Sequence, residues 1–213
     1  MMQKTHVWDI YIRLFHWALA VSVITCYVAL EINDIELHMT AGSIALGLII
    51  FRLLWGVVGS QTALFWDFIK GPIAIFEYLK TGYSKSMGHS PVGALSVVAL
   101  LGMVGFQTVA GLFASAPDSF IYGPMANEVS SSTSKWFTGW HKFNGYWLQY
   151  LIGLHILAIL FYKFFKKQGL TVPMITGFAN KEIAAERSLS VGHIKAAVAI
   201  IIAAVISYMV GFF

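Results

Sequence analysis

Four histidines of this sequence lie in or at the ends of strongly apolar segments, where a titratable side chain is uncommon. They are His16, His38, His141 and His155. Ionisable side chains at membrane depth are costly and usually serve a function. His141 and His155 are fourteen residues apart in one apolar segment. On a helix they therefore share one face, separated by about 21 Å along the axis. One helix thus offers two imidazoles, one above the other.

Five apolar segments are long enough, or nearly so, to cross a bilayer as helices. Of the 213 residues, 58% are hydrophobic and only 11% are charged, whereas soluble domains carry about a quarter charged residues. This composition predicts an all-α integral membrane protein and excludes nucleic-acid binding as the origin of the net charge of +4. The predicted spans are residues 14–30, 39–58, 91–117, 143–162 and 196–213.

The basic residues are distributed unequally between the loops, and this predicts the orientation of the chain. With the N-terminus in the cytoplasm, 12 of the 14 Lys and Arg residues lie on the cytoplasmic side. Only Lys135 and Lys142 lie outside, and the five acidic residues there give the outer loops a net charge of −3. We expect a multi-pass protein of a bacterial inner membrane, with a cytoplasmic N-terminus and a periplasmic C-terminus.

Two connections between the spans are long enough to contain structure of their own. Residues 63–85 mix aromatic and aliphatic side chains with charges, which is typical of a helix lying in the membrane interface. The Gly71-Pro72 pair predicts a break in that helix. Ser90 and Pro91 predict the start of the third span, as cap and first helical residue. Residues 116–135, with their run of Ser and Thr, are expected to form a polar loop.

In this topology the four histidines fall into two pairs at matching depths. His38 lies opposite His141 near the outer surface, and His16 lies opposite His155 toward the inner surface. Two opposed imidazoles are what a six-coordinate haem needs from a helix bundle. The single cysteine, Cys26, excludes a CxxCH attachment. We therefore predict a four-helix transmembrane bundle holding two stacked, non-covalent b haems, plus a fifth, C-terminal transmembrane helix.

Other residues suit a haem as well. Gly42 and Gly145 each follow a proposed ligand by four residues, so on the same helix face they leave room for a flat macrocycle. Arg52 is expected to bind a propionate of the inner haem, because no Asp or Glu lies in any span. Arg13 and Lys142 could bind propionates at the two rims. The plainer interpretation of Arg52 is an anchor that reaches the headgroups.

Several segments resemble the prokaryotic cytochrome b561 family, which includes the b-type cytochrome subunit of nickel-iron hydrogenases. The similarity runs from Trp8 to Gly177 through VWDIYIRLFHWALA, HMTAGSIALGLIIFRLLWGVVGS, GHSPVGALSVVALL, QTVAGLFA, LIGLHILAILFYKF and MITG. The resemblance implies a four-helix di-haem core that exchanges electrons with quinone and a redox partner, and it places the ligands on the same four histidines. We divide the chain into a di-haem domain, residues 1–177, and a linker with the additional helix, residues 178–213.

The first functional interpretation is a cytochrome that transfers electrons across the membrane, between the quinone pool and a periplasmic c-type cytochrome or hydrogenase. The second is a superoxide-oxidising quinone reductase, with Lys135 and Lys142 attracting the anion, although the acidic outer loops oppose such steering. The third is a histidine-based metal or proton transporter, which the absence of carboxylates in the spans disfavours. The sequence leaves open whether the chain is an enzyme in its own right and whether it forms a homodimer.

The expected partners within the membrane are lipid and quinone. A quinone site needs an apolar slot and one or two polar groups that bind the carbonyls. We expect this site at the cytoplasmic side near the inner haem, where His89 of GHSPVG, Arg13 and the aromatic interfacial segment converge. The alternative for His89 is a structural role at the start of the third span.

Overall fold

The computed structural model describes residues 3–82, 88–181 and 191–211 of the chain. Five of its helices are long and apolar enough to cross a membrane, which confirms the prediction of an all-helical multi-pass membrane protein. Lys85 and Arg187, two of the basic residues assigned to the cytoplasmic side, lie outside the described residues, as does Phe213 at the end of the fifth predicted span. The spanning helices are α1 (Ile10–Glu31), α2 (Ile35–Val58), α5 (Pro91–Phe113), α6 (Ser131–Phe164) and α8 (His193–Gly211).

Helix α6 differs most from its predicted span. It begins at Ser131, twelve residues before the apolar segment that starts at residue 143, so the expectation of a loop over residues 116–135 is wrong at its C-terminal end. The hydroxyl of Ser130 caps the helix by accepting a hydrogen bond of 3.3 Å from the Thr133 amide. As a consequence, His141 lies about three turns inside the helix rather than at its start.

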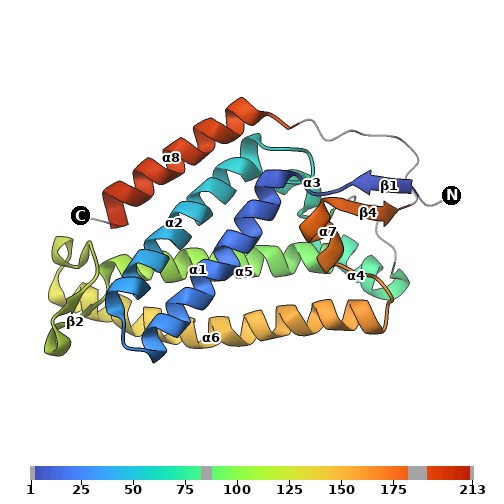
Figure 1. Cartoon of the computed structure of the whole chain (residues 1–213). Coiled ribbons are helices and arrows are strands. Elements are labelled where there is room, and N and C mark those ends of the chain that lie inside the picture. Colours follow the sequence, from blue (N-terminus) through green and yellow to red (C-terminus); the bar gives the residue numbers. More distant parts are fainter. Residues whose placement is uncertain (1–2, 83–87, 182–190, 212–213) are drawn as a thin grey trace.

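The connection between α5 and α6 forms a small hairpin. Strand β2 (Ser115–Ala116) pairs antiparallel with β3 (Ile121–Tyr122), with 3-10 turns η1 (Pro117–Ser119) and η2 (Ala126–Glu128) around them. Pairing of β2 ends α5 at Phe113, four residues before the predicted boundary. We call this side of the molecule, with the α1–α2 loop and the last residues of α8, the hairpin end (Figure 1).

The opposite end, here called the N-terminal end, carries the remaining short elements (Figure 1). Strand β1 (Gln3–His6) pairs antiparallel with β4 (Phe178–Lys181), which follows helix α7 (Thr171–Thr176). Helices α3 (Phe65–Phe68) and α4 (Pro72–Thr81) are separated at Gly71-Pro72 as predicted. Ser90 caps α5, and Pro91 is its first residue, which confirms the predicted helix start.

A buried carboxylate fastens α1 to α2 at the N-terminal end. Asp9 caps α1 by accepting a hydrogen bond of 2.9 Å from the Ile12 amide. Its other oxygen accepts one of 3.2 Å from the Trp55 indole and one from the Ser60 hydroxyl. Asp9 and Trp55 are both fully buried. Because an unpaired buried carboxylate is very costly, these three donors explain how it is tolerated here.

Helix α8 packs on α2, on the opposite side of the bundle from α6 (Figure 1). The Ser207 hydroxyl donates to the Ser43 carbonyl at 2.6 Å, and the Ser43 hydroxyl donates to the Gly211 carbonyl at 3.2 Å. Small residues let two membrane helices approach closely. The buried residues of α8 are all small: Ala196, Ala199, Ala203, Ser207 and Gly211.

Candidate functional site

The rings of His38 and His141 face each other between α2 and α6. Their centres are 6.1 Å apart, and their planes are inclined by 85°. A metal–imidazole bond is about 2 Å long, so two imidazoles on opposite sides of one metal ion have their ring centres about 6 Å apart. His38 and His141 thus face each other as helix depth predicts, and their spacing would suit two imidazoles that hold one iron between them; their role as ligands stays a prediction.

Both rings are oriented by backbone carbonyls. Nδ1 of His38 lies 2.9 Å from the Cys26 carbonyl oxygen, and Nδ1 of His141 lies 3.0 Å from the Gln107 carbonyl oxygen. A carbonyl only accepts, so each Nδ1–H donates and each Nε2 keeps its lone pair. This arrangement is typical of histidines that bind metals through Nε2.

A cavity of about 530 Å³ surrounds this pair. Its volume lies within the range of about 300–1,000 Å³ that is usual for cofactor sites, and most of its walls are apolar side chains from α1, α2, α5 and α6. The predicted site residues that line it are His38, Gly42, His141, Lys142 and Gly145.

The glycines around the cavity differ in how closely they are packed. A Cβ at Gly42 would meet nothing within 4 Å, and one at Gly145 would lie 3.0 Å from the Gln107 amide nitrogen. A Cβ at Gly111 on α5 would lie only 2.9 Å from Cε1 of His141. Gly111 is thus the position where a side chain would press on a proposed ligand. Sequence reasoning missed it, although it lies in the QTVAGLFA segment.

Two amides on α5 and α6 also reach the ligand pair. The Asn144 amide donates to the Gln107 side-chain oxygen at 2.7 Å and to the Met103 carbonyl at 3.0 Å. The Gln107 amide nitrogen then lies 3.3 Å from Nε2 of His141. If His141 held a haem iron through this Nε2, the iron would take the place of the Gln107 contact. The sequence signal for both residues was their polarity within apolar spans.

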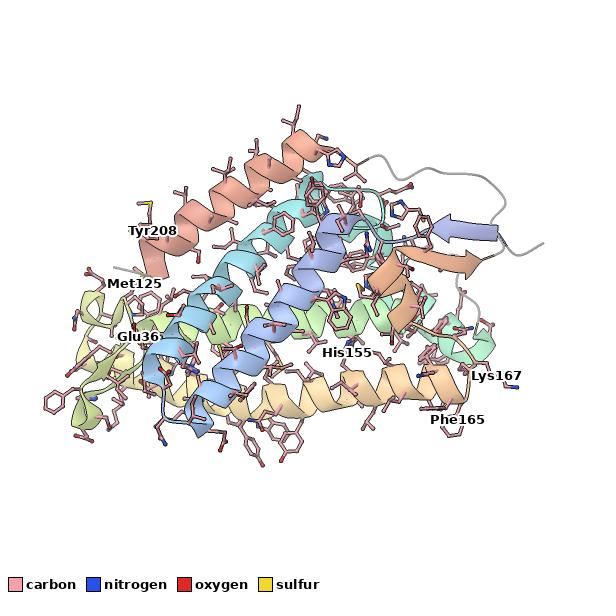
Figure 2. The ribbon with its side chains drawn as sticks, viewed as in Figure 1. Glu36, Met125, His155, Phe165, Lys167 and Tyr208 are labelled. Atoms are coloured by element: carbon pink, nitrogen blue, oxygen red, sulfur yellow. The ribbon has the colours of Figure 1, made fainter. Side chains whose placement is uncertain are left out.

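The second predicted pair lies in the other half of the bundle. His16 and His155 are close enough for their ring charges to interact, and Figure 2 shows His155 on α6 between the two ends of the molecule. The His16 ring packs edge-on against Trp17, with centres 5.0 Å apart. Its Nδ1 is buried and has no hydrogen-bond partner in the described part of the chain. A ligand would satisfy such a nitrogen, and joint ligation of an inner haem stays a prediction.

Arg52 has surroundings that the sequence did not indicate. Only 3% of it is exposed, and its guanidinium lies 4.6 Å from the ring centre of Phe65 and 5.8 Å from that of Phe68. Asp9, which precedes the first span, is close enough to interact with it electrostatically. Haem propionates are therefore not the only anions available to Arg52. Its Nη1 has no partner among the described residues, so propionate binding stays a prediction.

Arg13 fastens α7 to α1. Its guanidinium donates to the Ile175 carbonyl, and the neighbouring Trp17 indole donates to the Met174 carbonyl at 3.3 Å. These carbonyls lie in the last turn of α7, where no further helical donors follow. Through these contacts the MITG segment, residues 174–177, holds α7 against α1. Binding of a haem propionate by Arg13 stays a prediction.

His89 and the aromatic segment of α3, two parts of the region expected to bind quinone, lie together at the N-terminal end, and quinone binding there stays a prediction. The His89 ring packs against Trp8, with centres 4.5 Å apart, and against Phe68 of α3, with centres 4.8 Å apart. The hydroxyls of Tyr78 on α4 and Tyr162 on α6 lie 2.7 Å apart. Tyr162 follows His155 by seven residues, so both side chains lie on one face of α6.

Among the described residues, no three or more His, Cys, Asp or Glu side chains come together as a metal site. The opposed imidazoles therefore fall short of the four ligands of a structural zinc site. A haem supplies four nitrogens itself and needs only two axial protein ligands. The residues present fit that need.

A membrane-spanning bundle with opposed imidazoles across an apolar cavity defines a haem-binding membrane protein. The model of the family described as prokaryotic cytochrome b561 matches residues 7–177. The chain belongs to the prokaryotic cytochrome b561 family, and this membership implies b-type haem and electron transfer in the membrane. No curated protein and no solved structure matches the chain.

Proposed function

We propose that the protein carries electrons across the membrane between the quinone pool and a soluble redox protein on the periplasmic side. The observation that carries this proposal is the opposed pair His38 and His141, whose Nδ1 groups are bound to carbonyls. We further propose two b haems per chain, held by His38 with His141 and by His16 with His155. A bound haem supplies a one-electron iron couple.

The chain's own residues determine how that couple is used. His38 with His141, and His16 with His155, would each hold a haem iron between two imidazoles, and iron held in this way would favour outer-sphere electron transfer over oxygen binding. The carbonyl bonds at Nδ1 raise the basicity of the ligands and hold the rings in place. Most of the walls around His38 and His141 are apolar, and Lys142 at the rim would offer a positive charge to a propionate.

Quinone is proposed to react at the N-terminal end, close to His16 and His155. His89 and the hydroxyl pair of Tyr78 and Tyr162 are the polar groups available there for its carbonyls. The aromatic side chains of α3 and the exposed apolar residues of α4 provide the apolar surroundings that such a site needs. The positive charge of this end suits the cytoplasmic side.

The test has two stages. A visible spectrum of the purified protein, oxidised and then reduced with dithionite, should show b-type haem, and its absence would contradict any role in electron transfer. A short-chain quinol should then reduce the haem, and His89→Ala should slow this reduction without lowering haem content. The matched control is His193→Ala, an exposed histidine at the same end that bonds to Tyr11 at 2.9 Å. Equal quinol kinetics in both variants would contradict the proposed quinone site.

A further inference from the structure

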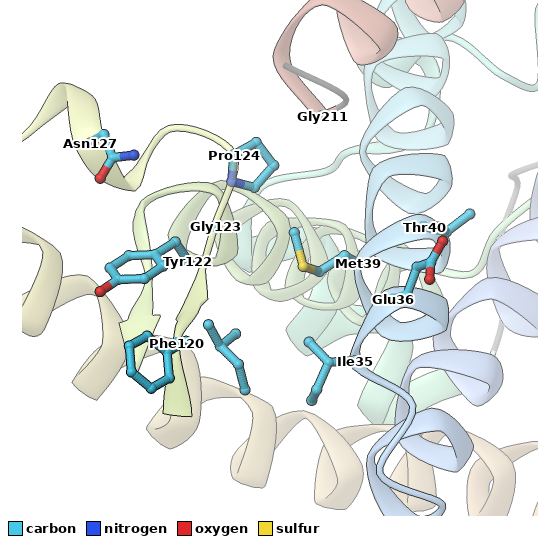
Figure 3. A pocket seen from close by; sticks show the side chains of 11 residues that line it. Ile35, Glu36, Met39, Thr40, Phe120, Tyr122, Gly123, Pro124, Asn127 and Gly211 are labelled. Carbon is cyan, nitrogen blue, oxygen red and sulfur yellow. The ribbon is translucent and has the colours of Figure 1, made fainter. Parts of the chain in front are cut away.

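A second pocket opens at the hairpin end. It has a volume of about 630 Å³ and lies between the start of α2, the hairpin and the end of α8. Figure 3 shows Ile35 and Met39 of α2 on one side, and Phe120 and Tyr122 of the hairpin across from them. Glu36 also lines it. We call it the hairpin pocket.

The hairpin pocket adjoins the cavity of His38 and His141. The two share five lining residues: Ile35, Met39, Ile121, Gly123 and Pro124. One layer of residues therefore separates the pocket from the ligand cavity. A redox protein seated at the pocket would bring its own centre close to the haem held by this pair.

The hairpin end is acidic and its carboxylates are exposed. Its two lysines, Lys135 and Lys142, are outnumbered by five carboxylates, so the net charge of this end is −3. Such a surface attracts positively charged partners and repels anions. It therefore also disfavours superoxide as the reactant at this end. The exposed carboxylates are Glu31, Asp34, Glu36, Asp118 and Glu128.

An aromatic residue projects from this acidic surface. Phe120 is 88% exposed, and its φ of +55° lies in the left-handed region, where bulky residues are uncommon. The Phe120 amide donates to the Pro117 carbonyl at 3.0 Å, which holds this turn. Strained backbone and a fully exposed aromatic side chain are both features of interaction sites.

We propose that the hairpin pocket docks a soluble redox protein with a basic surface, one of whose Lys or Arg side chains enters the pocket. The aliphatic stem of that side chain packs on Ile35 and Met39, and its charged group lies between Glu36 and the rings of Phe120 and Tyr122. This inference rests on the proposed function and adds the chemical class of the partner and its place of docking.

The experiment measures how fast the reduced, full-length protein is oxidised by two forms of one soluble c-type cytochrome. The first form is lysine-rich, and the second is the same cytochrome with its lysines succinylated to carboxylates. We expect the lysine-rich form to react at least about tenfold faster at low salt, as for electrostatically steered association. Raising the salt from about 10 mM to about 150 mM, which shortens the Debye length from about 30 Å to about 8 Å, should remove most of that advantage.

Two sets of variants locate the docking site. The triple variant Glu36→Lys, Asp118→Lys and Glu128→Lys should reverse the preference for the lysine-rich form. Phe120→Ala should slow its reaction at every salt concentration. The matched controls are Glu77→Lys and Phe165→Ala, exposed residues at the N-terminal end, and both should leave the rates unchanged.

The outcomes separate this inference from the proposed function. If neither cytochrome form oxidises the reduced haem although quinol reduces it, the proposed function fails. If both forms react equally fast and charge reversal changes nothing, the docking site is overturned while electron transfer stands. If charge reversal accelerates reaction with superoxide and leaves the cytochrome rates unchanged, the pocket is a small-anion site and the inference is wrong.

Discussion

Adding one methyl group at Gly111 should weaken haem binding at the His38 and His141 pair. The new Cβ would lie 2.9 Å from Cε1 of His141, whereas ordinary contacts begin at 3.4 Å. The ring must therefore move away from α5 by about 0.5 Å. Gln107, whose carbonyl accepts the Nδ1 hydrogen bond of 3.0 Å, lies one turn away on that same helix. Movement of the His141 ring therefore lengthens its hydrogen bond to the Gln107 carbonyl toward the longest distance at which a hydrogen bond still forms.

The expected magnitude follows from the cost of overpacking. Forcing an extra methyl group into a packed site costs about 1–3 kcal/mol, which corresponds to a loss of about 5- to 150-fold in haem affinity. Replacing Gly by Ala within a helix gains up to about 1 kcal/mol in helix stability. Gly111→Ala should therefore yield a folded protein that has lost affinity specifically at this site.

The assay is a titration of haem-depleted protein with haemin, followed by reduced-minus-oxidised spectra and a pyridine haemochrome count. The control is Gly102→Ala on the same helix, where a Cβ would meet nothing within 4 Å. It should keep full haem content and gain slightly in thermal stability. If Gly111→Ala bound haemin at both sites with wild-type affinity, our account of how His141 is positioned would be refuted.

Three further predictions address the two haems. A pyridine haemochrome assay should give two haems per chain, both removed by acid acetone, and a count of one would contradict the second pair. His38→Ala or His141→Ala should remove one spectral component and His16→Ala or His155→Ala the other, because the pairs share only α6. Loss of the same component from His38→Ala and His155→Ala would show the pairing to be wrong. Arg52→Gln removes a positive charge that favours reduced haem, so a redox titration should show a lower potential for the inner haem alone. If neither potential shifted, Arg52 would be a structural residue.

The spanning helices could be predicted from the sequence because membrane insertion depends on long apolar runs. The extra turns of α6 could not, since residues 131–142 mix polar and aromatic side chains and contain no long apolar run; the helix begins directly after its cap, Ser130. The pairing of β1 with β4 was also beyond prediction. Those four-residue strands are separated by nearly the whole chain, and α7 is needed to bring them together.

That His38 and His141 face each other could be predicted because depth in a membrane follows directly from position along a spanning helix. Their binding of haem, and the pairing of His16 with His155 around a second haem, stay predictions. The residues that support the two rings could not be predicted. Helix α5 is apolar over most of its circumference, and its few polar residues, Gln107 among them, were the only indication of the side that faces α6. Gly111 has no such signal, because a glycine in an apolar helix does not show which side it packs on. The proximity of Asp9 to Arg52 could not be predicted from the spans alone, because Asp9 lies just before the first one.

The pairing of β1 with β4 bears on the order in which the protein can be assembled. Residues 3–6 are synthesised well before their partners at residues 178–181, which emerge only after α6 is complete. Helix α8 follows β4 in the chain, so β1 and β4 can pair before α8 packs on α2. Every residue lining the cavity of His38 and His141 lies between Val23 and Gln149. Helix α8 therefore contributes no wall to this cavity and supports it only indirectly, through its packing on α2.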